Sequence, residues 1–134
     1  MEADVELLLR VVEAYNRRDL HALAQLTTDD FVFVPYLSNL IEKSTYRGHR
    51  GWVKYFQEAD TAWSYLRVRL DDARELGDGV LYGSGEITGE GRASRLEVRI
   101  PLFWIAGIRD GKLSRMQAFQ SEPDALRAAT ATAA

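Results

Sequence analysis

The spacing of apolar residues changes near Ser64, and this change limits the possible folds more than any other feature of the chain. Before it, one run recurs at the three- and four-residue intervals of a helix with a single buried face: Trp52, Phe56, Ala59 and Trp63. After it, apolar and charged residues alternate over 66–71, as they do in a strand with one buried face. The chain therefore predicts helices in its first half and strands in its second.

Two other helices, the second of them short, and one strand are predicted before this point. Apolar residues over 4–17 follow helical spacing, and Asp19 is placed to cap a second helix that begins at Leu20. The run 31–35 is apolar on both faces and ends in a proline, which predicts a buried strand. No period is visible over 36–48, and a connection of this length is typical of a lid or a binding loop.

Glycine-rich turns divide the second half into strands. Gly77-Asp78-Gly79 and Gly89-Glu90-Gly91 bound a strand over 80–88, and a further alternating strand follows around Val98 and Ile100. In these strands we take the even positions to face inward.

Asp110-Gly111 predicts the last hairpin, which leads into a strand over 113–121. A two-residue loop would place Ala118 beside Phe103. A three-residue loop with a bulge at the glycine would place it beside Leu102, on the inner face. We favour the second, because it directs Arg115 outward with the other charged residues.

A final helix is predicted to start near Glu122-Pro123, and the tail from Ala128 is expected to be frayed. Consecutive, hairpin-linked strands after helices indicate the α+β class rather than a doubly wound parallel sheet. Glycines within long strands let a sheet bend around its helices. We therefore expect one domain over residues 1–134, with a curved, mostly antiparallel sheet and covering helices around a mostly apolar pocket.

Charge and composition exclude several classes of function. Seventeen basic and twenty acidic residues give a net charge of −3, so neither nucleic acid nor an anionic membrane is an expected partner. The chain has no cysteine, and His21 and His49 have no carboxylate at a ligand spacing. We expect no metal and no cofactor, although a site made of carboxylates alone stays open. The acidic N-terminus and the short apolar run over 100–108 favour a cytoplasmic protein.

Three segments together resemble one family. They are Val11-Val12-Glu13-Ala14-Tyr15-Asn16-Arg17-Arg18-Asp19-Leu20, Tyr46-Arg47-Gly48-His49-Arg50-Gly51 and Ile108-Arg109-Asp110-Gly111-Lys112-Leu113. In this order and spacing they resemble the SnoaL-like polyketide-cyclase branch of the NTF2-like superfamily, with ketosteroid isomerase and limonene-epoxide hydrolase as relatives. The resemblance runs from about Leu7 to Ala128 and implies a cone-shaped NTF2-like fold, but it does not fix a function.

The resemblance implies where the acid/base residues of relatives would stand. Ketosteroid isomerases have an Asp directly before the proline that closes the first strand, where this chain has Val34. The cyclases and epoxide hydrolases have an Asp on the last strand, six residues after the hairpin lysine, where this chain has Ala118. The epoxide hydrolases also use an Arg and an Asp two residues apart, and here these positions are Ser84 and Glu86.

Glu86 is therefore the one candidate acid/base residue. Even-inward alternation would direct it into the pocket near Tyr82 and Ser84, where burial would raise the pKa of a carboxyl group toward neutrality. The alternative is that this glycine-rich strand twists or bulges and that Glu86 faces solvent. The alternation within the strand leaves both orientations open.

Other side chains are candidates for holding a ligand. Tyr36 and Asn39 lie in a loop comparable to the one that holds the water-positioning Tyr and Asn of epoxide hydrolases, and Gln120 could bond to a ligand carbonyl or to water at the mouth. The expected wall, which could equally be ordinary core, consists of Tyr15, Val34, Trp52, Tyr55, Phe56, Tyr82, Ser84, Val98, Ile100, Leu102, Trp104, Met116 and Ala118. His49 is expected to cap or pack against a helix and His21 to lie at the surface.

Four odd-numbered apolar residues are expected to face away from the pocket: Ile87, Phe103, Ile105 and Phe119. An exposed patch of this kind marks an interface. The resembled family often dimerises through this face of the sheet, so we expect a symmetric homodimer.

Three functions fit these observations. The first is an enzyme that acts on a hydrophobic carbonyl or epoxide by cyclisation, isomerisation or epoxide opening, with Glu86 as acid/base residue. The second is a protein that binds a hydrophobic ligand without turnover. The third is an NTF2-type interaction module. The loss of carboxylates at Val34 and Ala118 favours the second over a standard family enzyme, whereas an inward Glu86 would favour the first.

Overall fold

The computed structural model of the chain describes residues 2–36 and 45–133, and it has the predicted α+β architecture. The described helices are α1 (Glu2–Arg17), α2 (Leu20–Leu26), α3 (Gly48–Ala62) and α4 (Glu122–Ala133). The described strands are β1 (Thr27–Val34), β2 (Tyr46–Arg47), β3 (Trp63–Gly77), β4 (Val80–Gly91), β5 (Glu97–Arg109) and β6 (Lys112–Phe119). None of the described helices is long and apolar enough to cross a membrane.

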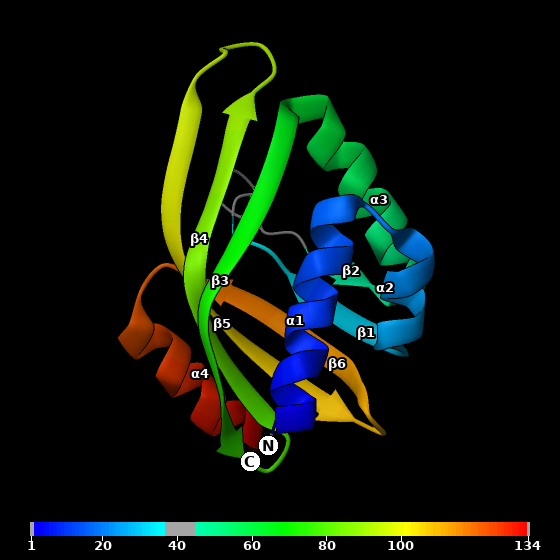
Figure 1. Cartoon of the computed structure of the whole chain (residues 1–134), viewed down its shortest axis with the longest axis vertical. Helices are drawn as coiled ribbons and strands as arrows, with labels where there is room; N and C mark the ends of the chain where they lie inside the picture. Colours follow the sequence, from blue (N-terminus) through cyan, green and yellow to red (C-terminus); the bar gives the residue numbers. More distant parts are fainter. Residues whose placement is uncertain (1, 37–44, 134) are drawn as a thin grey trace.

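The strands form one six-stranded curved sheet in the order β2-β1-β6-β5-β4-β3. All neighbouring strands are antiparallel except β1 and β6, which are parallel. Helices α1, α2 and α3 lie on one side of the sheet and α4 on the other (Figure 1). The larger core therefore lies between the sheet and the first three helices, on the face called inner below.

Local contacts fix α1 and α2 on the inner face. The Asp19 carboxylate accepts a hydrogen bond from the Ala22 backbone amide, which confirms the predicted cap of α2. The Asn16 side-chain amide exchanges two hydrogen bonds with the backbone of Val68, each 2.8 Å long. Since β3 is at the edge of the sheet, this pair both anchors α1 and satisfies edge groups that would otherwise be unpaired.

The last hairpin places Ala118 on the inner face, as predicted, but its turn differs from the predicted one. Arg109 pairs with Lys112 across a two-residue turn in which both central residues, Asp110 and Gly111, have positive φ. The predicted three-residue loop is therefore wrong. A bulge at Ser114 then shifts the register, so that Ala118 pairs with Trp104 on the inner face.

Strand β4 has the opposite orientation to the one expected. Residues that pair directly share a face, and Ile87 pairs with both Val68 of β3 and Ile100 of β5. Odd positions of β4 therefore face inward together with even positions of its neighbours. The even-inward expectation was wrong for this strand, and Ile87 is a buried core residue rather than part of an outer patch.

Glycines made the orientation of β4 hard to predict, because three of its inward positions are Gly83, Gly85 and Gly89. At Gly83 a Cβ would lie 3.0 Å from Leu70 Cδ1 and 3.3 Å from Leu8 Cδ2. Neighbouring elements thus supply the apolar volume that the strand itself lacks. A strand with few apolar side chains on its buried face gives little periodic signal.

A second, smaller core lies on the outer face beneath α4. Val80, Tyr82 and Ile105 are buried there with Ala125 and Ala129 of the helix, and half-buried Phe103 and Phe119 pack against them. Ala129 is buried and α4 extends to Ala133, whereas the fraying expected for the tail from Ala128 stays a prediction. The outward direction expected for Phe103, Ile105 and Phe119 is right, but these residues contact α4. The homodimer stays a prediction.

Candidate functional site

The described residues enclose an apolar cavity between the inner face of the sheet and helices α1 and α3. It measures about 30 Å³ as the space open to the centre of a water molecule. Its lining consists of Val11, Val12, Tyr15, Phe33, Pro35, Tyr36, Trp52, Tyr55, Val68, Ile87, Leu102, Trp104, Met116 and Ala118. No carboxylate or imidazole is among these described lining residues, so no general base is in place within this part of the site.

Two of the tyrosines that line this cavity are joined through their hydroxyl groups. The Tyr15 and Tyr55 hydroxyl oxygens lie 2.5 Å apart, and both side chains are buried. Burial raises the pKa of Tyr15 to about 12, and it raises the pKa of Tyr55 well above its usual value of 10, with further increases from its contact with Tyr15. Both hydroxyl groups are therefore protonated at neutral pH. One of the two protons is used in the bond between them, and the other can be donated to a ligand oxygen.

Helices α1 and α3 position this pair. Tyr15 is on the inward stripe of α1, and Tyr55 is on the stripe of α3 that also holds Trp52 and Phe56. The Phe56 ring packs against both tyrosines, with ring centroids 5.5 Å from Tyr15 and 5.3 Å from Tyr55. Aromatic rings on two sides limit the directions in which the hydroxyl groups can point.

Aromatic side chains also form the wall next to the pair. The Phe33 ring centroid lies 4.8 Å from that of Trp52 and 5.0 Å from that of Tyr55, with the second contact edge-to-face. Phe33 was not predicted, because Val34 was expected to face the pocket. Phe31 and Phe33 are the buried aromatic residues of β1, whereas Val34 is half-buried and is not among the residues that line the cavity.

A tyrosine and a glutamine meet at the mouth of the cavity. The Tyr36 hydroxyl donates a 2.5 Å hydrogen bond to Gln120 Oε1, and Tyr36 also lines the cavity. Gln120 itself is exposed and lines an adjoining outer cleft instead. Asn39, which was also predicted to bind ligand, lies outside the described residues.

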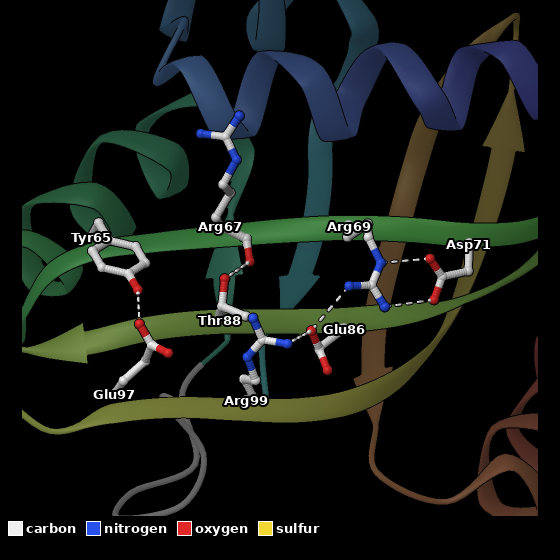
Figure 2. Close-up of polar contacts among 8 residues, drawn as sticks. All are labelled: Tyr65, Arg67, Arg69, Asp71, Glu86, Thr88, Glu97 and Arg99. Atoms are coloured by element: carbon white, nitrogen blue, oxygen red, sulfur yellow. Dashed lines mark hydrogen bonds and ion pairs between the residues drawn. The ribbon is translucent and has the colours of Figure 1, made fainter.

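Glu86, the predicted acid/base residue, is on the opposite side of the sheet from the cavity. Its carboxylate lies 3.2 Å from Arg69 Nη1 and 3.7 Å from Arg99 Nη1, within a row of polar side chains on the outer face (Figure 2). Arg69 also pairs with Asp71, at 2.7 Å. The prediction was wrong because it assumed even-inward alternation in β4. A carboxylate held by two arginines on the outer face cannot exchange a proton with a ligand in the cavity.

Tyr82 and Ser84 were placed in the pocket by the same assumption, and they too face outward. The Tyr82 hydroxyl donates a hydrogen bond to the Glu122 carboxylate at the start of α4, and the Arg74 guanidinium lies over the tyrosine ring. Tyr82 therefore fastens α4 to the sheet and does not contact the cavity.

The structure thus brings together about half of the predicted ligand-binding residues. Those in the cavity are Tyr15, Tyr36, Trp52, Tyr55, Leu102, Trp104, Met116 and Ala118. Predicted residues outside its lining are Val34, Phe56, Tyr82, Ser84, Val98, Ile100 and Gln120. Phe56 and Ile100 belong to the same core but are not among the residues that line the cavity.

Six lining residues were missed: Val11, Val12, Phe33, Pro35, Val68 and Ile87. The helical stripe that includes Val12 and the alternation that directs Val68 inward were both visible in the sequence. Nothing in the glycine-rich sequence around Ile87 indicated its direction.

Metal binding and histidine chemistry find no support in the described residues. No group of three His, Cys, Asp or Glu side chains that could hold a metal ion occurs among them. A ring nitrogen of His49 lies 3.2 Å from the Thr27 carbonyl oxygen, and His49 is not among the described residues that line the cavity, in agreement with the predicted packing role. His21 is exposed, as expected.

Solved structures of other proteins share this fold at low sequence identity. An NTF2-like protein of unknown function from Burkholderia pseudomallei superposes with a TM-score of 0.78 at 16% identity, over 95% of this chain and 97% of that one. TerC, co-crystallised with polyporic acid, gives 0.77 at 17% identity, over 96% and 98%. A protein from Jannaschia named as a SnoaL-like polyketide cyclase gives 0.72 at 17%, over 96% and 91%.

No protein of curated function matches the chain by sequence. The family model of the SnoaL-like domain does match, over residues 8–116. This range runs from the middle of α1 to the middle of β6 and contains every described residue that lines the cavity except Ala118. A SnoaL-like match over most of the chain agrees with the NTF2-like fold and with the cavity between sheet and helices, and the chain therefore belongs to the SnoaL-like domain family.

Proposed function

We propose that this protein binds a small, flat, apolar molecule that contains an oxygen atom, and that the Tyr15–Tyr55 pair binds this oxygen. The observation that supports the proposal is a hydroxyl pair with one proton to spare, buried in a cavity whose other described walls are almost entirely apolar. Ligand sites typically combine such walls with a few placed polar groups. Aromatic walls at Trp52 and Trp104 favour a planar ligand.

The ligand must displace side chains as it enters. A cavity of about 30 Å³ has room for water, whereas ligand pockets typically measure roughly 300–1,000 Å³. Met116, which is flexible, and Tyr36 at the mouth are the lining residues best suited to move. We therefore expect small ligands of one or two rings.

The experiment compares a ketone with a hydrocarbon of the same shape. Acetophenone and α-methylstyrene differ only in C=O against C=CH₂, and binding of either can be followed by the fluorescence of Trp52 and Trp104. The Tyr15→Phe/Tyr55→Phe double variant is expected to weaken acetophenone binding about three- to tenfold, as for one lost hydrogen bond, and to leave α-methylstyrene binding nearly unchanged.

Tyr65→Phe is the matched control, since Tyr65 is on the outer face and donates its hydrogen bond to Glu97 (Figure 2). Equal losses for the two ligands in the double variant would contradict the proposal. So would an unchanged preference for the ketone.

An enzyme that acts on a hydrophobic carbonyl or epoxide is the second candidate. Two observations favour it. Some proteins whose solved structures resemble this chain are named polyketide cyclases. The tyrosine pair also offers a hydroxyl donor that could polarise a carbonyl group. Exchange of the methyl hydrogens of acetophenone for deuterium in heavy water, followed by NMR, measures enolisation directly. Exchange that is faster than in buffer, and that returns to the buffer rate in the tyrosine double variant, would favour turnover. Exchange at the buffer rate with the unaltered protein would favour binding alone.

A further inference from the structure

A second space adjoins the cavity at its mouth, and we call it the outer cleft. It is open to solvent, and its described lining includes Phe119, Gln120, Ser121 and Asp124. As the space open to the centre of a water molecule it measures about 600 Å³, against about 30 Å³ for the cavity. Ligand sites typically measure roughly 300–1,000 Å³, so the outer cleft has the room that the cavity lacks.

Tyr36 and Ala118 separate the two spaces, because among the described residues they alone line both. Ala118 is fixed in β6, where it pairs with Trp104 of β5. Tyr36 is held by the 2.5 Å hydrogen bond that its hydroxyl donates to Gln120 Oε1. A ligand that enters by displacing Tyr36 breaks this bond, and the cavity then becomes continuous with the outer cleft.

Breaking this bond leaves two polar groups without their partners. The Tyr36 hydroxyl needs an acceptor, and Gln120 Oε1 needs a donor. A ligand group that accepts from the hydroxyl and donates to the amide oxygen restores both interactions at once. A carboxamide can do both, whereas a carboxylate can only accept and an alkyl group can do neither.

The charges at the outer cleft favour an uncharged group. Asp124 is the carboxylate among the described lining residues, and it pairs with Arg127 three residues later in α4. Both side chains are more than half exposed, so the paired carboxylate offers a cation little net attraction. A carboxylate on the ligand would meet the like charge of Asp124 and gain no hydrogen bond to Gln120 Oε1.

We propose that the outer cleft binds a second part of the ligand, a short arm that ends in an uncharged group able both to donate and to accept hydrogen bonds, such as a carboxamide. The arm starts opposite the oxygen bound by the tyrosine pair and passes between Tyr36 and Ala118. Its end group accepts from the Tyr36 hydroxyl and donates to Gln120 Oε1. This inference rests on the binding site proposed above and specifies its ligand class.

Three ketones of one shape test the proposal. Each is acetophenone with a two-carbon arm para to the acetyl group, and the arm ends in a carboxamide, a carboxylate or an isopropyl group. Acetophenone, which lacks the arm, is the reference, and the binding of all four is followed by tryptophan fluorescence. In the unaltered protein, the carboxamide is expected to bind at least about threefold more tightly than the carboxylate, as for one hydrogen bond gained.

Two substitutions remove the groups that bind the arm. Gln120→Leu removes the amide, and Tyr36→Phe removes the hydroxyl. Each is expected to lower the ratio of carboxamide to isopropyl affinity about three- to tenfold, as for one lost hydrogen bond. Gln117→Leu is the matched control and should leave this ratio unchanged, since Gln117 pairs with Ile105 on the outer face and accepts a hydrogen bond from Arg115. Tyr36→Phe decides the matter if Gln120→Leu fails to fold.

The outcomes separate this inference from the proposed function. A ratio that falls in Gln120→Leu and Tyr36→Phe, but not in Gln117→Leu, supports the second binding position. A ratio unchanged in the first two variants overturns it, and so does binding of all three arm-bearing ketones that is far weaker than that of acetophenone; in both cases the cavity stays intact as a site. Equal affinity for carboxamide and carboxylate overturns the requirement for an uncharged arm. Failure of acetophenone itself to bind contradicts the proposed function and the inference with it.

Discussion

Replacing the paired tyrosines one at a time and then together tests whether their hydroxyl groups depend on each other. Both are buried and hydrogen-bonded to each other. Tyr55→Phe leaves the Tyr15 hydroxyl without that partner, which costs about 1–3 kcal/mol of unfolding free energy, and Tyr15→Phe does the same to Tyr55. The double variant removes both polar groups and leaves neither unpaired, so its cost is expected to be about 1 kcal/mol or less.

Urea unfolding followed by circular dichroism gives these free energies for the protein and the three variants. The double variant is expected to be no less stable than the less stable of the two single variants. The losses of unfolding free energy would then be strongly non-additive. Additive costs would contradict the reasoning. Two negligible single costs would mean that water replaces the lost partner, for which the cavity has room at about 30 Å³.

Three other properties follow from the structure. Because the pKa of Tyr15 is raised to about 12 in the folded state, its contribution to stability is complete below pH 10 and is lost as the pH rises through 10 to 12, at about 1.4 kcal/mol for each unit of difference. Urea unfolding at several alkaline pH values measures this loss, which is expected to be smaller in Tyr15→Phe, where the buried Tyr55 still contributes, and smallest in the Tyr15→Phe/Tyr55→Phe variant; an equal loss in all three proteins would contradict the reasoning. Glu86→Gln is expected to leave binding of acetophenone unchanged within about twofold, because the carboxylate is on the outer face; a tenfold loss would place it back in the site. Asn16→Ala, which removes both bonds to Val68, should lower the unfolding free energy by about 1–3 kcal/mol without altering ligand preference, and a change of preference would contradict its purely structural role.

The sequence was sufficient for the fold wherever apolar residues followed a clear period. The helical stripe of α3 and the alternation of β3 and β5 are directed as predicted, and Asp19 caps α2. In each case the buried face is apolar in the residues of the element itself. Burial then follows from the local pattern, whatever the rest of the chain does.

The site was less predictable, because it depends on pairing between strands. The direction of Glu86 is fixed by the register of β4 against β3 and β5, and the register depends on turns and bulges that are not visible as periodicity. Likewise, Tyr15 and Tyr55 were each recognised as candidate wall residues. Their hydroxyl–hydroxyl contact depends on how α1 packs against α3, which no spacing within either helix specifies.

The infrared stretching frequency of a bound carbonyl group tests the central claim most directly. A hydrogen bond from the Tyr15–Tyr55 pair weakens the C=O bond, so acetophenone labelled with carbon-13 at the carbonyl should absorb at lower frequency in the protein than in an apolar solvent. In the Tyr15→Phe/Tyr55→Phe variant the band should return to the apolar-solvent position, with Tyr65→Phe unchanged. A bound ketone that already absorbs at the apolar-solvent position in the unaltered protein would contradict the claim that this pair binds the ligand's oxygen.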